Sequence, residues 1–291
     1  MKSDAEVLVL DKSTNVRINI PLPVRFAMGL LSRVAPGMAA KLAIGIFLHP
    51  QGSRPLRPAE EKLLATATPF RLQAEGYDLP AWSWGNGPTV LLQHGWGSRG
   101  SHLGQFVEPL VKAGYSVVTY DAPAHGQSPG RTTNAFEVGR VVLQLTRKLG
   151  GVHAIIGHSI GCSASGFAMR AGAPVQRAVF LNPPDEMETH TAQFAAALGF
   201  TNKVFERIKT DFESSAKGLW TDFEPSSLAR GQRAPLLVIS DRDDRTVPWR
   251  GGRAIAEAWP DGEFHQTAGL GHLRVLKNAA VIERVVEFVR G

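Results

Sequence analysis

The chain has 291 residues, a formal net charge of +6 and an isoelectric point near 9.7, a length that suits one large α/β domain or two small ones. Its lysines and arginines are scattered and do not alternate with aromatic residues, which disfavours nucleic-acid binding. The single cysteine, Cys162, excludes an intramolecular disulfide and a multi-cysteine metal site. We therefore expect an ordinary globular protein of the cytoplasm.

Residues 1–66 form an amino-terminal extension without a visible catalytic motif. Three acidic residues among the first eleven positions interrupt the run that a secretory signal needs, so we predict no signal peptide. Residues 6–21 alternate weakly, as in a hairpin around residues 12–15, and residues 25–48 have the pattern of two helices broken at Pro36-Gly37. Charged residues and this break make the second stretch a poor transmembrane span. We favour docking of these helices on the protein's own surface, with peripheral membrane contact as the alternative.

From about residue 70 onward, short apolar runs alternate with helical patterns, which is typical of a mostly parallel sheet covered by helices. We assign residues 67–291 to this α/β domain. The predicted strands are 89–94, 115–120, 153–157, 178–181, 236–240 and 263–266. The predicted helices are 102–112, 135–148, 161–170, 252–259 and 278–289.

A helical insertion interrupts the alternation from about residue 185 to residue 232, where no strand pattern intervenes. Many of its apolar residues recur at three- or four-residue spacing, as in helices that lie over an apolar surface. Two interpretations remain open, which are a lid over a substrate pocket and simple packing on the core.

The most specific motif is Gly157-His-Ser-Ile-Gly161, which directly follows a predicted strand and directly precedes a predicted helix. The two glycines permit a tight turn, or elbow, that exposes the serine hydroxyl above the sheet. Backbone N–H groups at the start of the helix would then point at an oxyanion formed beside the serine. We therefore predict that Ser159 is a nucleophile.

A serine hydroxyl needs a base that removes its proton, and a histidine base needs a carboxylate that fixes its tautomer. His272 follows the last predicted strand and precedes the last predicted helix, so we expect it on a loop at the sheet edge. Several carboxylates crowd the preceding segment, namely Asp241, Asp243 and Asp244. The pattern alone leaves all three open as partners of the histidine.

The elbow and the chain order of serine, acidic segment and histidine resemble the α/β-hydrolase fold superfamily, over about residues 70–291. In that superfamily the acid typically stands three residues before Val-Pro, which selects Asp244 and keeps Asp241 and Asp243 as fallbacks. The segment His94-Gly-Trp-Gly resembles the superfamily's oxyanion loop, and the resemblance assigns the two N–H donors to Trp96 and Ile160. It also implies a central, mostly parallel sheet flanked by helices.

Two further motifs lie at residues 95–100 and 121–128. Residues 121–128 resemble the D-x-P-G-H-G-x-S turn of many superfamily members, with alanine in the fourth place, which implies structural roles for Asp121 and His125. The G-x-G-x-x-G pattern at residues 95–100, together with Asp121, also mimics a dinucleotide-binding fingerprint. We disfavour a dinucleotide site because it leaves the serine, the acid and the histidine unexplained.

Together these patterns predict a serine hydrolase of the esterase or lipase type that needs no cofactor and no metal. It would cleave a carboxylic ester or a related acyl bond through an acyl-enzyme. The apolar insertion suggests a small, uncharged ester as the substrate. Thioesterase or acyltransferase chemistry on the same fold is one alternative. A ligand-binding protein with incidental catalysis is another, although such a protein would be expected to lose part of the triad.

Overall fold

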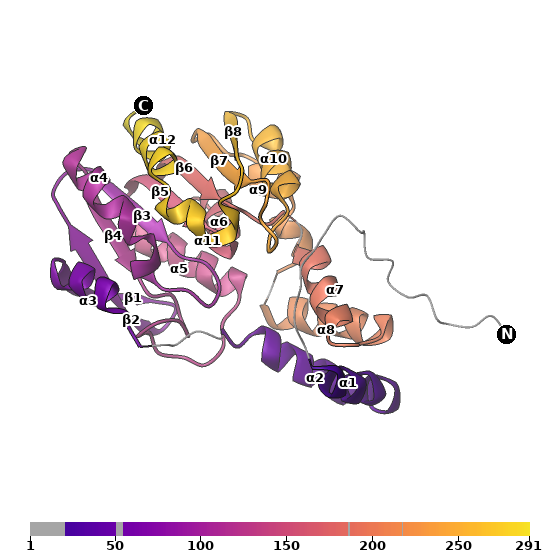
Figure 1. Cartoon of the computed structure of the whole chain (residues 1–291). Helices are drawn as coiled ribbons and strands as arrows, with labels where there is room; N and C mark the ends of the chain where they lie inside the picture. The colour runs from indigo at the N-terminus through magenta and orange to yellow at the C-terminus, as the bar shows by residue number, and fades with distance from the viewer. Residues whose placement is uncertain (1–20, 51–54, 186, 217) are drawn as a thin grey trace.

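A single eight-stranded sheet organises the computed structural model, which describes residues 21–50, 55–185, 187–216 and 218–291 (Figure 1). The strand order is β1-β2-β4-β3-β5-β6-β7-β8; β2 is antiparallel to both of its neighbours, and the pairs from β4 to β8 are parallel. The predicted mostly parallel sheet is confirmed. The strands are β1 (Thr68–Ala74), β2 (Tyr77–Trp84), β3 (Thr89–Gln93), β4 (Ser116–Tyr120), β5 (Val152–His158), β6 (Val175–Leu181), β7 (Leu236–Asp241) and β8 (Gly262–Thr267).

Two apolar cores cover the two faces of this sheet. In β3, Val90 and Leu92 pack with α4 and α12 on one face, whereas Leu91 between them packs with the helices of the other face. Burial on both faces explains why the central strands read as continuous apolar runs instead of alternating ones. The helices concerned are α4 (Val107–Lys112) and α12 (Ala279–Arg290) on the first face, and α5 (Ala135–Lys148), α6 (Ile160–Arg170) and α10 (Trp249–Ala258) on the second.

The first strand pair and three short helical segments were not predicted. Glu75 and Gly76 join β1 to β2 with φ values of 49° and 78°, as a two-residue hairpin turn of the twisted sheet requires. The prediction of a single α-helix over residues 102–112 is wrong in its first part. The segment begins as a 3₁₀ helix, η1 (Gly100–Phe106), and continues as α4; 3₁₀ segments are common at helix starts. The unpredicted α3 (Pro58–Ala65) precedes β1, and α11 (Gly271–Arg274) and η3 (Val275–Lys277) precede α12.

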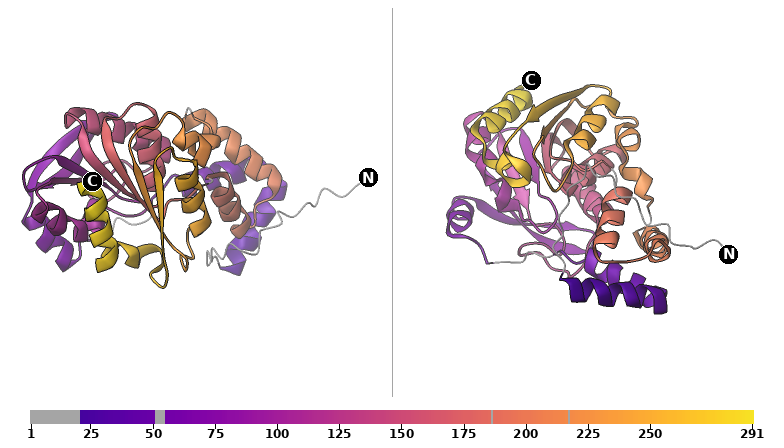
Figure 2. Two further views of the ribbon diagram at one scale, coloured as in Figure 1. Left: turned by 90° about the horizontal axis from the view of Figure 1, so that it is seen from above. Right: turned by 45° about the vertical axis from the view of Figure 1, so that its right-hand side comes forward.

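Six further helical segments lie outside these layers. The two expected at the amino terminus are α1 (Leu22–Val34) and α2 (Pro36–Phe47), and the break falls at Ala35 because Pro36 begins α2. The insertion between β6 and β7 holds α7 (Met187–Ala197), α8 (Asn202–Ala216), η2 (Trp220–Phe223) and α9 (Pro225–Ala229). Figures 1 and 2 show α1 and α2 beside α7 and α8, away from the sheet. The hairpin expected around residues 12–15 lies outside the described residues.

Among the residues that the structure describes, no helix is both long and apolar enough to cross a bilayer.

An aromatic cluster ties the insertion to the helices around it. The ring of Phe212 on α8 lies 5.8 Å from Phe47 of α2, 6.2 Å from Phe136 of α5 and 5.7 Å from Trp220. The Phe212 side chain is only 1% exposed. The insertion is therefore packed on the body of the protein through a buried aromatic side chain.

Truncation of the Phe212 side chain should therefore lower the stability of the fold. We expect Phe212→Ala to lower the free energy of unfolding by roughly 3–5 kcal/mol, because it removes a buried ring and leaves a cavity. The control is Phe26→Ala, since Phe26 is 76% exposed on α1, and its effect should stay within about 0.5 kcal/mol. Urea unfolding followed by circular dichroism measures both variants; equal effects would contradict the packing described here.

Candidate active site

Loops from the carboxyl ends of several strands converge at one edge of the sheet. Trp96 follows β3, Ser159 follows β5, Asp244 follows β7 and His272 follows β8. Parallel strands bring their carboxyl ends to the same edge, which is where open α/β sheets carry their ligand sites. The topology thus gathers residues that are up to 176 positions apart in the sequence.

The turn that carries Ser159 is tight because two glycines permit close contact on either side. Ser159 itself has φ 54° and ψ −131° between the end of β5 and the start of α6. A Cβ atom on Gly157 would lie 3.0 Å from the backbone of Cys162, and one on Gly161 would lie 2.5 Å from the His94 carbonyl oxygen. Larger residues would force the elbow apart, so the two glycines are required by contact and not by their own φ angles.

A continuous chain of hydrogen bonds runs from Ser159 through His272 to Asp244. The serine Oγ and the His272 Nε2 atom are 3.1 Å apart, and His272 Nδ1 is 2.7 Å from Asp244 Oδ2. The second oxygen of Asp244 accepts the N–H groups of Thr246 at 2.7 Å and Val247 at 3.0 Å. This pattern assigns the Nδ1–H tautomer to His272, which leaves Nε2 free to accept the serine proton.

Burial differs along this chain of hydrogen bonds. The Asp244 side chain is fully buried, whereas 17% of the His272 side chain is exposed. The acid is therefore shielded from water, and the histidine retains access to a molecule that approaches Ser159.

The two fallback carboxylates lie near His272 but bond to its loop and not to its ring. Asp241 accepts the N–H groups of Leu270 at 3.0 Å and Gly271 at 2.9 Å, and Asp243 accepts that of Gly269 at 2.8 Å. Burial opposes ionisation of Asp241, but these N–H groups and the Thr267 hydroxyl outweigh it and hold the pKa of Asp241 below its usual value. Both residues anchor the loop that carries the histidine.

Two residues that sequence reasoning missed also hold this loop. His158 Nε2 lies 3.0 Å from the His272 carbonyl oxygen, and the amide of Asn182 donates to the same oxygen at 3.4 Å. The Asn182 side-chain oxygen accepts the N–H of Asp241 at 2.9 Å, so Asn182 bridges β7 and the loop after β8. Its φ of 47° is common for asparagine at turns, and an asparagine directly after a predicted strand was the only available signal.

The candidate oxyanion loop is held by a buried histidine. His94 Nδ1 donates to the Gly95 carbonyl at 2.8 Å, and its Nε2 accepts the N–H of Ala122 at 2.9 Å. Burial lowers the pKa of His94 to about 4, so the ring stays neutral and keeps both bonds. A Cβ atom on Gly95 would lie 3.0 Å from the Ser159 Cβ, so this loop passes directly beside the serine.

Ile160 is the first residue of α6, so its N–H has no acceptor within the helix. Trp96 follows Gly95 on the loop that faces this helix start. Both residues therefore border the space next to the serine.

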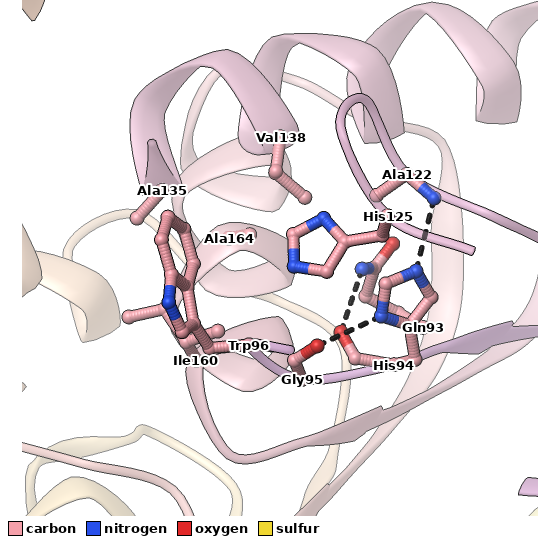
Figure 3. Close-up of a pocket in the computed structure, with 10 residues that line it drawn as sticks. All are labelled: Gln93, His94, Gly95, Trp96, Ala122, His125, Ala135, Val138, Ile160 and Ala164. Atoms are coloured by element: carbon pink, nitrogen blue, oxygen red, sulfur yellow. Dashed lines mark hydrogen bonds between the residues drawn. The ribbon is translucent and has the colours of Figure 1, made fainter. Parts of the chain in front are cut away.

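A small cavity lies behind these two residues (Figure 3). Its apolar walls are Trp96, Ala135, Val138, Ile160 and Ala164. His125 also lines it, and its Nε2 is buried without a partner among the described residues, while Nδ1 lies 2.9 Å from the Pro123 carbonyl oxygen. Burial lowers the pKa of His125 to about 3, so this ring brings a polar atom but no charge to the cavity, which Gln93 and His94 also line.

Asp121 serves the turn that the sequence resemblance implied for it. Its carboxylate accepts the N–H groups of Gly100 at 2.9 Å and Gln127 at 2.8 Å, and burial raises its pKa. A dinucleotide site would need this carboxylate to contact a ribose, but the side chain is buried and already engaged. Among the described residues, no cluster of His, Cys, Asp and Glu could hold a metal ion.

Comparison with known proteins assigns this chain to a family. Residues 89–284 match the model of the Alpha/beta hydrolase family. A 2-hydroxy-6-oxononadienedioate/2-hydroxy-6-oxononatrienedioate hydrolase from Dechloromonas aromatica (strain RCB) is 28% identical over 249 residues, covering 68% of this chain and 85% of that protein. A pimeloyl-[acyl-carrier protein] methyl ester esterase from Xanthomonas axonopodis pv. citri (strain 306) is 24% identical over 242 residues, covering 70% and 95%.

The arrangement of the elements has solved counterparts as well. An esterase from Pyrococcus furiosus has a structure similar to this one, with a TM-score of 0.60, 19% identity, and coverage of 84% of this chain and 97% of that one. The fold is thus that of a hydrolase built on a mostly parallel, helix-covered sheet. The chain belongs to the alpha/beta hydrolase family, as the sequence motifs predicted.

Three neutral histidines around the site make folding sensitive to acid. Burial lowers the pKa of His94 to about 4 and those of His125 and His158 to about 3, from 6.5. Below pH 6.5 the unfolded chain therefore binds more protons than the folded one, and stability present above that pH is lost as the pH falls. We expect each histidine to cost up to about 2 kcal/mol at pH 5.

Urea unfolding at pH 7.5 and pH 5.0 tests this prediction, because both values lie above the ordinary pKa values of Asp and Glu, about 3.9 and 4.3. The unfolding midpoint should fall clearly between the two pH values. An unchanged midpoint would mean that these rings are charged, or not buried, in the folded protein.

Proposed function

We propose that the protein is a serine hydrolase that cleaves a carboxylic ester or a related acyl bond through an acyl-enzyme on Ser159. The observation that carries the proposal is the hydrogen-bonded chain Ser159–His272–Asp244, with distances of 3.1 Å and 2.7 Å. Nucleophile, base and orienting acid in this geometry form the constellation that acyl transfer needs. The sequence relatives support the same reading, since two of them are named as a hydrolase and an ester esterase.

Each residue of the chain has a distinct task in the proposed reaction. Ser159 Oγ attacks the acyl carbon while His272 Nε2 takes its proton, and Asp244 stabilises the imidazolium that forms. The N–H groups of Trp96 and Ile160 would bind the negative oxygen of the tetrahedral intermediate. His272 then returns the proton to the leaving alcohol, and a water molecule, activated by the same histidine, releases the acid and restores the serine.

The insertion and the amino-terminal extension fit this function as accessory parts. We propose that residues 67–291 form the hydrolase domain, that residues 185–232 cover the entrance to the site as a lid, and that residues 1–66 are an extension. The ring of Phe47 at the end of α2 lies 6.4 Å from Trp96 and 5.8 Å from Phe212 of α8. Phe47 of the extension therefore lies against both the oxyanion loop and the insertion.

Ser159→Ala tests the function most simply. We expect the purified variant to lose hydrolysis of p-nitrophenyl butyrate by at least about 10³-fold, because the nucleophile is gone. Ser163→Ala is the matched control, since this serine lies buried on the same helix and its hydroxyl has no partner among the described residues. Equal activity of wild type and Ser159→Ala would refute the proposal, and an inactive wild type would favour the ligand-binding alternative.

The acid of the triad can be tested separately. Asp244→Asn keeps the shape of the side chain but can no longer fix the tautomer of His272, and we expect kcat to fall by about 10³–10⁴-fold. Asp243→Asn, next to it in sequence, should change kcat by less than about threefold, because among the described residues the Asp243 side chain bonds only the Gly269 N–H. The reverse order of effects would move the role of the acid to Asp243.

We propose that the cavity behind Trp96 and Ile160 receives the acyl group of the substrate, which would set the preference among acyl groups. A carboxylate placed among its apolar walls would lose hydration without gaining a cation, which is unfavourable. We expect kcat/KM for p-nitrophenyl butyrate to exceed that for mono-p-nitrophenyl succinate, an ester of equal chain length, by more than about tenfold. Comparable values for the two esters would show that this cavity does not receive the acyl group.

A further inference from the structure

Large apolar side chains are exposed mainly on the two amino-terminal helices. Of nine such side chains in the described residues, seven belong to α1 and α2, and they are between 41% and 78% exposed. Six of them recur every four residues, which keeps neighbours on one helix side by side. These six residues, here called the apolar stripe, are Leu22, Phe26, Leu30, Val34, Met38 and Leu42, and the seventh exposed side chain is Val24.

Docking on the rest of the protein accounts for the other side of these helices. On α1, Gly29 and Ser32 are buried, and the Ser32 hydroxyl lies 2.9 Å from that of Thr201. On α2, the buried residues are Ala39, Ala40 and Ala43, where the helix packs on α8. Ser32 lies about 200° around the helix from Leu30, at about 100° per residue. Among the described residues, the side chains of the stripe are therefore left largely uncovered by the rest of the protein.

The charged side chains of α1 and α2 all have one sign. No aspartate or glutamate occurs between residues 12 and 59. Within α1 and α2, the exposed ionisable residues are Arg25, Arg33 and Lys41. An apolar stripe on helices whose own charged side chains are all cations is complementary to an anionic surface with an apolar layer beneath it.

We propose that the apolar stripe of α1 and α2 binds the surface of an anionic lipid bilayer, with both helices lying in the plane of the interface. A helix of 13 residues is about 20 Å long and cannot cross a hydrocarbon core of about 30 Å. Self-association through this face would bring two sets of cations together, which is unfavourable. The inference does not rest on the proposed enzymatic function.

The bound lipid would lie close to the candidate active site. At its carboxyl end, α2 places Phe47 against Trp96 and against Phe212 of α8. Figure 1 and Figure 2 show the same two helices at one end of the molecule, beside the insertion. Binding would therefore hold the insertion and the oxyanion loop near the lipid surface.

Co-sedimentation of the full chain with vesicles tests the proposal. We expect binding to phosphatidylcholine vesicles that contain about one quarter phosphatidylglycerol, and at least tenfold weaker binding to phosphatidylcholine alone. Raising the salt from about 0.1 M to about 0.5 M should weaken binding to the anionic vesicles, because it screens Arg25 and Lys41. Arg25→Gln with Lys41→Gln should reduce both the binding and its dependence on salt.

A second set of variants tests the contribution of the apolar side chains to vesicle binding. Phe26→Ser with Leu30→Ser should weaken vesicle binding at least tenfold, whereas Leu219→Ser, an exposed leucine of the insertion that is 56% exposed, should leave it unchanged. Circular dichroism and thermal unfolding check that the double variant remains folded, and hydrolysis of p-nitrophenyl butyrate without vesicles should be the same as in wild type. No binding by the wild type, or equal binding by the double variant, would overturn the proposal. A dimer that Phe26→Ser with Leu30→Ser dissociates would assign the stripe to a second copy instead.

Discussion

Ser159 is held at φ 54° and ψ −131° between β5 and α6, a conformation that costs a residue with a side chain about 1–3 kcal/mol. The neighbouring packing maintains it, because Gly161 lies against the His94 carbonyl oxygen and Gly157 lies against the Cys162 backbone. The strained turn sets the serine beside His272 and beside the loop of Trp96 at the same time. The rest of the site therefore depends on how closely β3, β5 and α6 approach one another.

The histidine side of the site depends on polar groups that are buried and satisfied. Asp241 bonds the backbone on the amino-terminal side of His272, and His158 and Asn182 bond its carbonyl oxygen. A side chain is positioned well when its backbone is fixed by several independent hydrogen bonds. Because the His158 ring must stay neutral to remain buried, the order of this loop and the acid stability of the fold are coupled.

The sequence could predict the features that have a local pattern. Apolar runs indicated the parallel strands, and the elbow motif and chain order indicated which loops carry Ser159 and His272. The choice of Asp244 over its neighbours relied on family resemblance. The spacing of residues in the sequence does not show which way each side chain points in a crowded loop. Asn182 and the turn at Glu75 escaped prediction for a similar reason, since their roles come from contacts between distant segments. The docked side of α2 likewise follows from its packing on α8, a contact between segments that are distant in the sequence.

The location of a covalent adduct shows directly whether Ser159 is the nucleophile. The wild-type protein is treated with a fluorophosphonate, digested, and analysed by peptide mass spectrometry. We expect one adduct per chain, on the peptide that contains Ser159, and none in Asp244→Asn over the time that labels the wild type completely. An adduct on a different serine, or no adduct on a protein that still hydrolyses esters, would contradict it.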